Sequence, residues 1–167
     1  MSTNITTTIE TVEGENVTVW RIEKDEGAIV ININKILGED VTDCHWEGNH
    51  QTYLIAEYSD WDSNELWAII DANGQLIKKG IRSIEQYIAK YQLFIVEMSG
   101  FALGYEATEY DLAPDDWKMA VINKHGDYII PPKYPQIDFE EGDDFFYVKN
   151  YSSEDIRKVS INGTSID

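Results

Sequence analysis

The segment DCHWEGNH contains Cys44, His45 and His50, which are residue types that can bind metal ions. A structural zinc site usually draws its ligands from two pairs, spaced C-x₂₋₄-C and H-x₃₋₅-H. This chain has a single cysteine, and no second pair accompanies the segment. We therefore predict an ordinary loop at this position and no metal site.

The segment DWDSNELWAIID (60–71) resembles the start of a calcium-binding loop, with Asp60, Asp62 and Asn64 at alternate positions. Such a loop needs glycine at its sixth position and a bidentate glutamate at its twelfth. Here those positions hold Glu65 and Asp71. The pattern therefore predicts no calcium site.

Motifs for nucleophilic or cofactor chemistry are missing from the sequence, including G-x-S-x-G, the phosphate loop and the dinucleotide fingerprint. Gly100 and Gly104 in SGFALGYE lack a following helix signal, so we expect a loop there. Two carboxylates held at a set separation can catalyse the hydrolysis of a glycosidic bond. Among 31 acidic residues some pair will always lie at that separation, so such a pair is not specific evidence. We predict a protein without catalytic residues or a cofactor.

Acidic residues outnumber basic ones by 31 to 13, which gives a formal net charge of −18. This excess repels nucleic acid and anionic membranes, and it accelerates encounter with a basic protein. We therefore expect no direct nucleic-acid or membrane partner. Simple solubility is the alternative explanation, since added Asp and Glu favour it most.

The acidic residues bunch in the ranges 57–65, 106–116, 140–144 and 153–156. The first, second and fourth bunches each precede the first strand of a predicted repeat. Because neighbouring strands lie about 4.8 Å apart, equivalent loops would form a ridge of negative charge; the alternative is that repeated loops are simply polar.

Aromatic residues among the acids are candidate anchors of a binding interface. Tyr58 and Phe145 are two of them. The residues that we predict to contact a basic partner are Asp60, Trp61, Asp62, Glu65, Glu109, Tyr110, Asp111, Asp115, Asp116, Glu140, Glu141, Asp143 and Asp144.

A repeated unit organises the chain. AVINKHGDYII (120–130) aligns without a gap with AIIDANGQLIK (68–78), and Trp20, Trp67 and Trp117 precede successive copies. A third strand follows each glycine, and VSINGTSI ends the chain as a half copy. We predict one domain over 1–167 with about three and a half units, at 17–60, 65–100, 116–151 and 156–167.

These units predict a mainly β fold. Asn73-Gly74, His125-Gly126 and Asn162-Gly163 are hairpin-turn dipeptides between apolar runs. We expect an antiparallel sheet that either curls toward a partial barrel or continues as a meander, with an edge strand available for homodimerisation. The spacing of apolar residues predicts one short helix over 83–92, and the recurrent tryptophans are predicted core anchors.

WAIIDANGQLI and VINKHGDYIIPPKYPQIDFEEG resemble the WG-repeat (KWG-repeat) family. The similarity is good over 117–148 and moderate over 67–87, and it covers about half the chain well. Ala68 replaces the glycine after tryptophan, Lys118-Met119 are inserted, and Pro-Pro-x-Tyr occurs only at 131–134. The resemblance implies a β-rich bacterial or phage-related binding protein without shared catalytic residues.

A single cysteine and an N-terminal stretch without an apolar core lead us to expect a cytoplasmic protein. Our leading hypothesis is a non-catalytic binding module whose acidic face docks a basic nucleic-acid-binding enzyme or toxin. It would act as a toxin-immunity protein or as a phage anti-defence antagonist, with carboxylates in place of phosphates. The alternatives are a structural scaffold and, third, a β-domain enzyme.

Overall fold

A computed structural model describes residues 3–24, 30–47, 52–60, 64–150 and 155–166. The fold is mainly β, with antiparallel sheets and short helices, so the predicted fold class is confirmed at that level. The chain forms two compact units, Met1–Lys79 and Gly80–Asp167. None of the helices that the structure describes has the length and apolar character that a membrane crossing requires.

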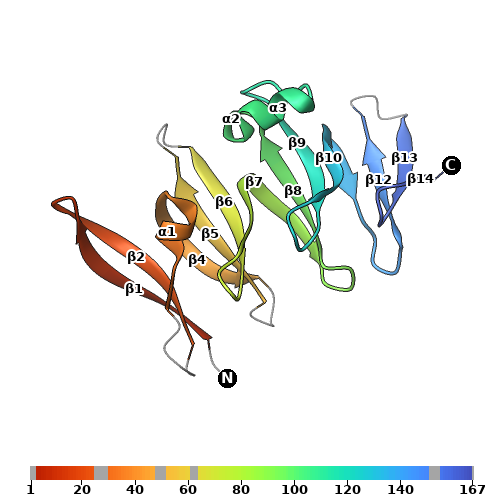
Figure 1. The fold of residues 1–167 in the computed structure, drawn as a ribbon. Helices are drawn as coiled ribbons and strands as arrows, with labels where there is room; N and C mark the ends of the chain where they lie inside the picture. Colours follow the sequence, from red (N-terminus) through yellow and green to blue (C-terminus); the bar gives the residue numbers. More distant parts are fainter. Residues whose placement is uncertain (1–2, 25–29, 48–51, 61–63, 151–154, 167) are drawn as a thin grey trace. The chain divides into compact units, whose positions relative to one another are not determined.

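The first unit contains two sets of antiparallel strands (Figure 1). β1 pairs with β2, and β2 pairs with β3; β5 lies between β4 and β6. The elements are β1 (Thr3–Val12), β2 (Glu15–Lys24), β3 (Val30–Asn32), α1 (Ile33–Leu37), β4 (Asp40–Glu47), β5 (Tyr53–Ser59), β6 (Glu65–Asp71) and the start of β7 (Leu76–Ile88).

The core of the first unit follows from the sequence of β5. Leu54, Ile55 and Ala56 are consecutive and fully buried, so both faces of this strand are covered. Leu54 lies opposite Ile70, and Ile55 lies opposite Ile69, both of which are also fully buried. A continuous apolar run of this kind is typical of a strand that is buried on two sides.

The second unit contains the rest of β7, which pairs with β8, and a separate four-stranded sheet of β11 to β14. One core cluster joins residues of β7 to β13, with Val121, Phe146 and Val148 almost fully buried. The elements are β8 (Leu93–Ser99), α2 (Gly100–Leu103), α3 (Tyr105–Glu109), β9 (Trp117–Ile122), β10 (Tyr128–Tyr134), β11 (Gln136–Asp138), β12 (Phe145–Lys149), β13 (Ile156–Ser160) and β14 (Ser165–Ile166).

The predicted hairpin turns are confirmed, and they share one set of hydrogen bonds. In each turn the residue three positions before the glycine accepts two backbone N–H groups with its side chain. Asp71 accepts at 2.9 and 2.8 Å, Asn123 at 2.9 and 3.0 Å, and Ser160 at 3.3 and 3.1 Å. Short polar side chains stabilise turns in this way. The turn chemistry is therefore repeated, while the number of repeats and the curling of the sheet stay predictions.

The helix predicted over 83–92 is wrong. β7 extends to Ile88, where it pairs with Leu93 of β8, and the residues that follow form a turn. The pairing of β7 with β8 shifts between Ile81 and Ser83 and again between Ile84 and Gln86. Because each shift adds a residue to one strand, the apolar residues lose the alternation of a regular strand and imitate helical spacing.

The loop expected around Gly100 and Gly104 is also wrong, because α2 and α3 occupy this stretch. α1 was not predicted from the sequence either. Its signals are present: the Asn32 side chain accepts the N–H of Lys35, and Gly38 ends the helix at φ 68°. Asparagine before a helix and glycine after it are recognised boundary residues.

The tryptophans are not the buried anchors that we predicted. Trp117 is 39% exposed, and the Arg82 guanidinium lies 4.9 Å from its ring centroid. Trp20 and Trp67 are half-buried. The fully buried large side chains of the described residues are instead aliphatic or methionine, together with Phe94 and Phe146. Trp20 lies within β2, Trp67 lies within β6, and Trp117 is the first residue of β9.

Candidate functional site

The predicted contact residues divide into three groups. Asp60 and Glu65 belong to the first unit, and Trp61 and Asp62 lie outside the described residues. The second unit carries an α3 patch and a β11–β12 patch. The α3 patch is Glu109, Tyr110, Asp111, Asp115 and Asp116; the β11–β12 patch is Glu140, Glu141, Asp143 and Asp144.

The α3 patch is held by two buried apolar residues. Ala107 is 3% exposed and Leu112 is 5% exposed, and the Leu112 N–H donates to the Ala107 carbonyl at 3.0 Å. This anchoring leaves all four carboxylates of the patch exposed. The N–H of Gly100 donates to the Asp116 carbonyl at 3.0 Å, which fixes the end of the patch against the start of α2.

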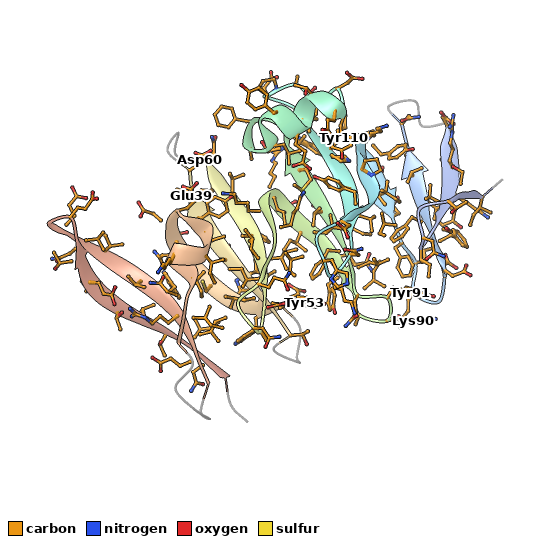
Figure 2. The ribbon with its side chains drawn as sticks, viewed as in Figure 1. Glu39, Tyr53, Asp60, Lys90, Tyr91 and Tyr110 are labelled. Carbon is orange, nitrogen blue, oxygen red and sulfur yellow. The ribbon has the colours of Figure 1, made fainter. Side chains whose placement is uncertain are left out.

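The β11–β12 patch occupies the turn between those strands. The Tyr91 hydroxyl approaches the Asp143 carbonyl at 3.5 Å, and the Ile161 N–H donates to the Asp144 carbonyl at 3.1 Å. Figure 2 shows Tyr91 and Tyr110 at opposite ends of the second unit. The structure therefore does not bring the two patches together.

Three of the aromatic residues that we expected to anchor a partner lie in the described part of the chain, and all three contact other residues of the protein. Tyr58 is 3% exposed and belongs to the core, so the prediction for it is wrong. The Tyr110 ring packs edge-on against Tyr128 at 5.5 Å, and the Phe145 ring packs against Tyr147 at 5.1 Å. The exposed part of the predicted sites therefore consists mostly of carboxylates, although Asp60 and Asp143 are half-buried.

Tyr110 of the α3 patch and its neighbour Tyr128 both lie near Glu106 of α3. Burial of the Tyr128 hydroxyl, followed by the Glu106 charge, raises the pKa of this group. Desolvation, followed by the charges of Glu106 and Glu109, also raises the pKa of Tyr110. Both hydroxyls therefore remain protonated donors at neutral pH, and neither is activated as a nucleophile.

Cys44 lies in β4 and not in the loop that we predicted, because its strand pairs it with Ala56. The side chain is buried. His45 is exposed on the same strand, and His50 lies outside the described residues. Within the described ranges no three His, Cys, Asp or Glu residues lie close enough to bind a metal ion.

The Cys44 thiol is predicted to be unreactive and to make stability depend on alkaline pH. Burial, followed by the charges of Asp43 and Glu57, raises its pKa from 9.0 to about 12. Above pH 9 the unfolded thiol loses its proton while the folded thiol keeps it, so stability falls from pH 9 to about 12 and is unaffected by this group below pH 9.

At pH 8 we expect a disulfide reagent to modify Cys44 of the folded protein at least about a hundredfold more slowly than Cys44 of the protein in guanidinium. Equal rates would contradict this environment.

The first unit contains a groove of about 590 Å³. β1 and β2 contribute Val12, Val17 and Val19. The α1–β4 turn contributes Glu39, and the start of β4 contributes Asp40. Asn32, Asn34 and Lys35 from the end of β3 and from α1, together with Ser59 and Asp60 at the end of β5, complete most of its lining. Figure 2 shows Glu39 and Asp60 on neighbouring parts of this unit.

Two side chains hold the walls of this groove together. The Asn34 side chain accepts the Trp20 N–H at 2.9 Å and donates to the Thr18 carbonyl at 3.1 Å. The indole N–H of Trp20 donates to the Val41 carbonyl at 3.1 Å. These bonds connect β2 to α1 and to β4. No motif in the sequence predicted the groove. The boundary residues Asn32 and Gly38 could have predicted α1, which contributes to its lining.

We expect Asn34→Ala to lower the free energy of unfolding of the first unit by about 2 kcal/mol, because two backbone groups lose their partners. Urea denaturation monitored by tryptophan fluorescence measures the loss. Asn4→Ala on exposed β1 is the matched control and should change stability by less than about 0.5 kcal/mol. Equal effects of both substitutions would show that Asn34 does not hold the groove.

The arrangement defines a class: an antiparallel β protein with exposed carboxylate patches and an acidic groove. Comparisons of the chain with protein-family models, with curated proteins and with solved structures gave no match.

Proposed function

We propose that this chain is a non-catalytic protein-binding module whose exposed carboxylates dock a basic partner protein. One observation carries the proposal: the carboxylates of the α3 patch and the β11–β12 patch form no salt bridge within the described residues. Charges without an internal partner concentrate negative potential at the surface. A basic protein that supplies the opposite charges would associate faster and more selectively.

The narrower form of the proposal is an inhibitor. A toxin or a nucleic-acid-binding enzyme presents a cationic cleft, and exposed carboxylates can occupy the positions of phosphates there. The protein would then act as an immunity protein or as a phage anti-defence antagonist in the cytoplasm. A relationship to the WG-repeat family supports a binding role, and it too is part of the proposal.

A scaffold role is the second candidate, and the outer edge of β1 favours it. β1 has ten residues, ends its sheet, and carries no strand on its outer side in the described part of the chain. Ile9 is 75% exposed and Val12 is 50% exposed. Long uncovered edge strands pair with further strands, so a second copy of the chain could bind there to form a homodimer.

The test is affinity capture from a lysate of the source cell, first at low salt and then at high salt. We expect a basic protein to be captured and then released by salt, since screening weakens exposed charge pairs. The double substitution Asp115→Lys/Asp116→Lys should weaken binding to that protein by about tenfold or more. Glu13→Lys/Glu15→Lys changes the charge equally at the β1–β2 turn and should have a smaller effect.

Two other outcomes of these experiments would change the proposed role of the protein. Equal losses with both pairs of substitutions would mean that only net charge matters. If nothing is captured at either salt concentration while sedimentation shows self-association, the scaffold role replaces the inhibitor role.

A further inference from the structure

The groove of the first unit combines an apolar wall and an acidic wall. The apolar wall is made by Val12, Val17 and Val19, and the acidic wall includes Glu39 and Asp40. Its volume of about 590 Å³ is within the range of small-molecule binding sites. We propose that this groove binds a lysine or arginine side chain from a basic segment of a partner protein.

The charges that line the groove are not balanced from within. Glu10 is already bonded to Arg21, and Asp60 accepts the Asn64 N–H at 2.9 Å. Glu39 and Asp40, by contrast, form no salt bridge with any described residue.

Among the described lining residues the one basic side chain is Lys35, which is exposed and likewise forms no salt bridge. One ammonium group cannot neutralise all the carboxylates around it. The groove therefore keeps a negative potential.

The two walls together select the kind of ligand. An anion would be repelled by the carboxylates, and a purely apolar ligand would remove water from Glu39 and Asp40 without replacing their hydrogen bonds. Lysine and arginine combine an apolar stem with a charged head. The stem would lie along the valines, and the head would reach the carboxylates of Glu39 and Asp40.

This inference rests on the proposed function, because it assigns to the basic partner a particular side chain and a particular site. It also makes a separate claim: a basic peptide should bind to the first unit through Glu39 and Asp40, and not through net charge alone.

The experiment measures binding of a hexa-arginine peptide to the full chain by calorimetry at physiological salt. Hexa-citrulline, which has the same shape without the charge, is the matched probe. The variant Glu39→Gln/Asp40→Asn removes two negative charges from the groove. The control variant Glu85→Gln/Asp127→Asn removes two exposed charges that belong neither to the groove nor to the predicted contact residues. Circular dichroism verifies that both variants fold.

We expect the groove variant to bind hexa-arginine about tenfold more weakly than the unsubstituted chain, and the control variant to stay within about twofold. Hexa-citrulline should not bind. Equal losses in both variants, or no binding of hexa-arginine to the unsubstituted chain, would overturn the inference. If either result occurs while Asp115→Lys/Asp116→Lys still weakens binding to the captured partner, the proposed function stands and only the groove assignment fails.

Discussion

Replacing Gly100 with alanine is expected to destabilise the second unit by about 3 kcal/mol or more. A Cβ atom at this position would lie 2.0 Å from the Ala113 carbonyl oxygen and 2.8 Å from the carbonyl carbon. Backbone atoms cannot rotate away as the end of a side chain can. The hydrogen bond from the Gly100 N–H to the Asp116 carbonyl would also be strained, since the two segments must separate.

The measurement is the free energy of unfolding from urea denaturation, with amide hydrogen exchange of residues 105–116 as a local readout. Gly142→Ala is the matched control in the same unit. Its site is open, with no atom within 4 Å, and only its φ of +94° opposes a side chain. We expect a loss of about 1–2 kcal/mol there. If Gly100→Ala lowers the free energy of unfolding by no more than Gly142→Ala does, position 100 does not lie as close to the Ala113 backbone as the structure shows.

Phe146→Ala is expected to lower the free energy of unfolding of the second unit by about 3–5 kcal/mol. The Phe146 side chain is fully buried in the core cluster, and its ring lies 5.4 Å from that of Phe139. Truncation removes apolar area from the core and leaves a cavity that surrounding strands fill only in part. Both effects act in the same direction.

Phe101→Ala makes the same chemical change at a side chain that is 43% exposed. We expect it to cost less than about 1 kcal/mol. Urea denaturation of both variants, followed by the same fluorescence signal, gives the comparison. Similar losses from the two substitutions would refute the assignment of Phe146 to the core of this unit.

The strands and turns of this protein follow largely from local sequence. Glycine at position 74, 126 or 163 supplies the positive φ of each turn, at +85°, +83° and +86°. The residue three positions earlier supplies the turn's side-chain acceptor. Both signals act over a few residues, so they can be read without knowledge of the rest of the fold.

The error over 83–92 has a different origin. Bulges in β7 are set by its pairing with β8, and they alter the apolar spacing on which a prediction of helix or strand depends. Tyr58 and Trp117 were misjudged for a related reason. Aromatic character does not determine which side of a strand other segments cover. Tyr58 is 3% exposed, whereas Trp117 is 39% exposed.

The sequence by itself determined the mainly β class, the hairpin turns and the large excess of carboxylates. Only the tertiary structure decided which carboxylates line a groove and which lie on open patches. The reason is that the groove depends on contacts between distant residues: Trp20 meets Asn34 and Val41, which lie 14 and 21 positions away. Such contacts form only when β2, α1 and β4 pack together, and no local pattern of residue types encodes their geometry.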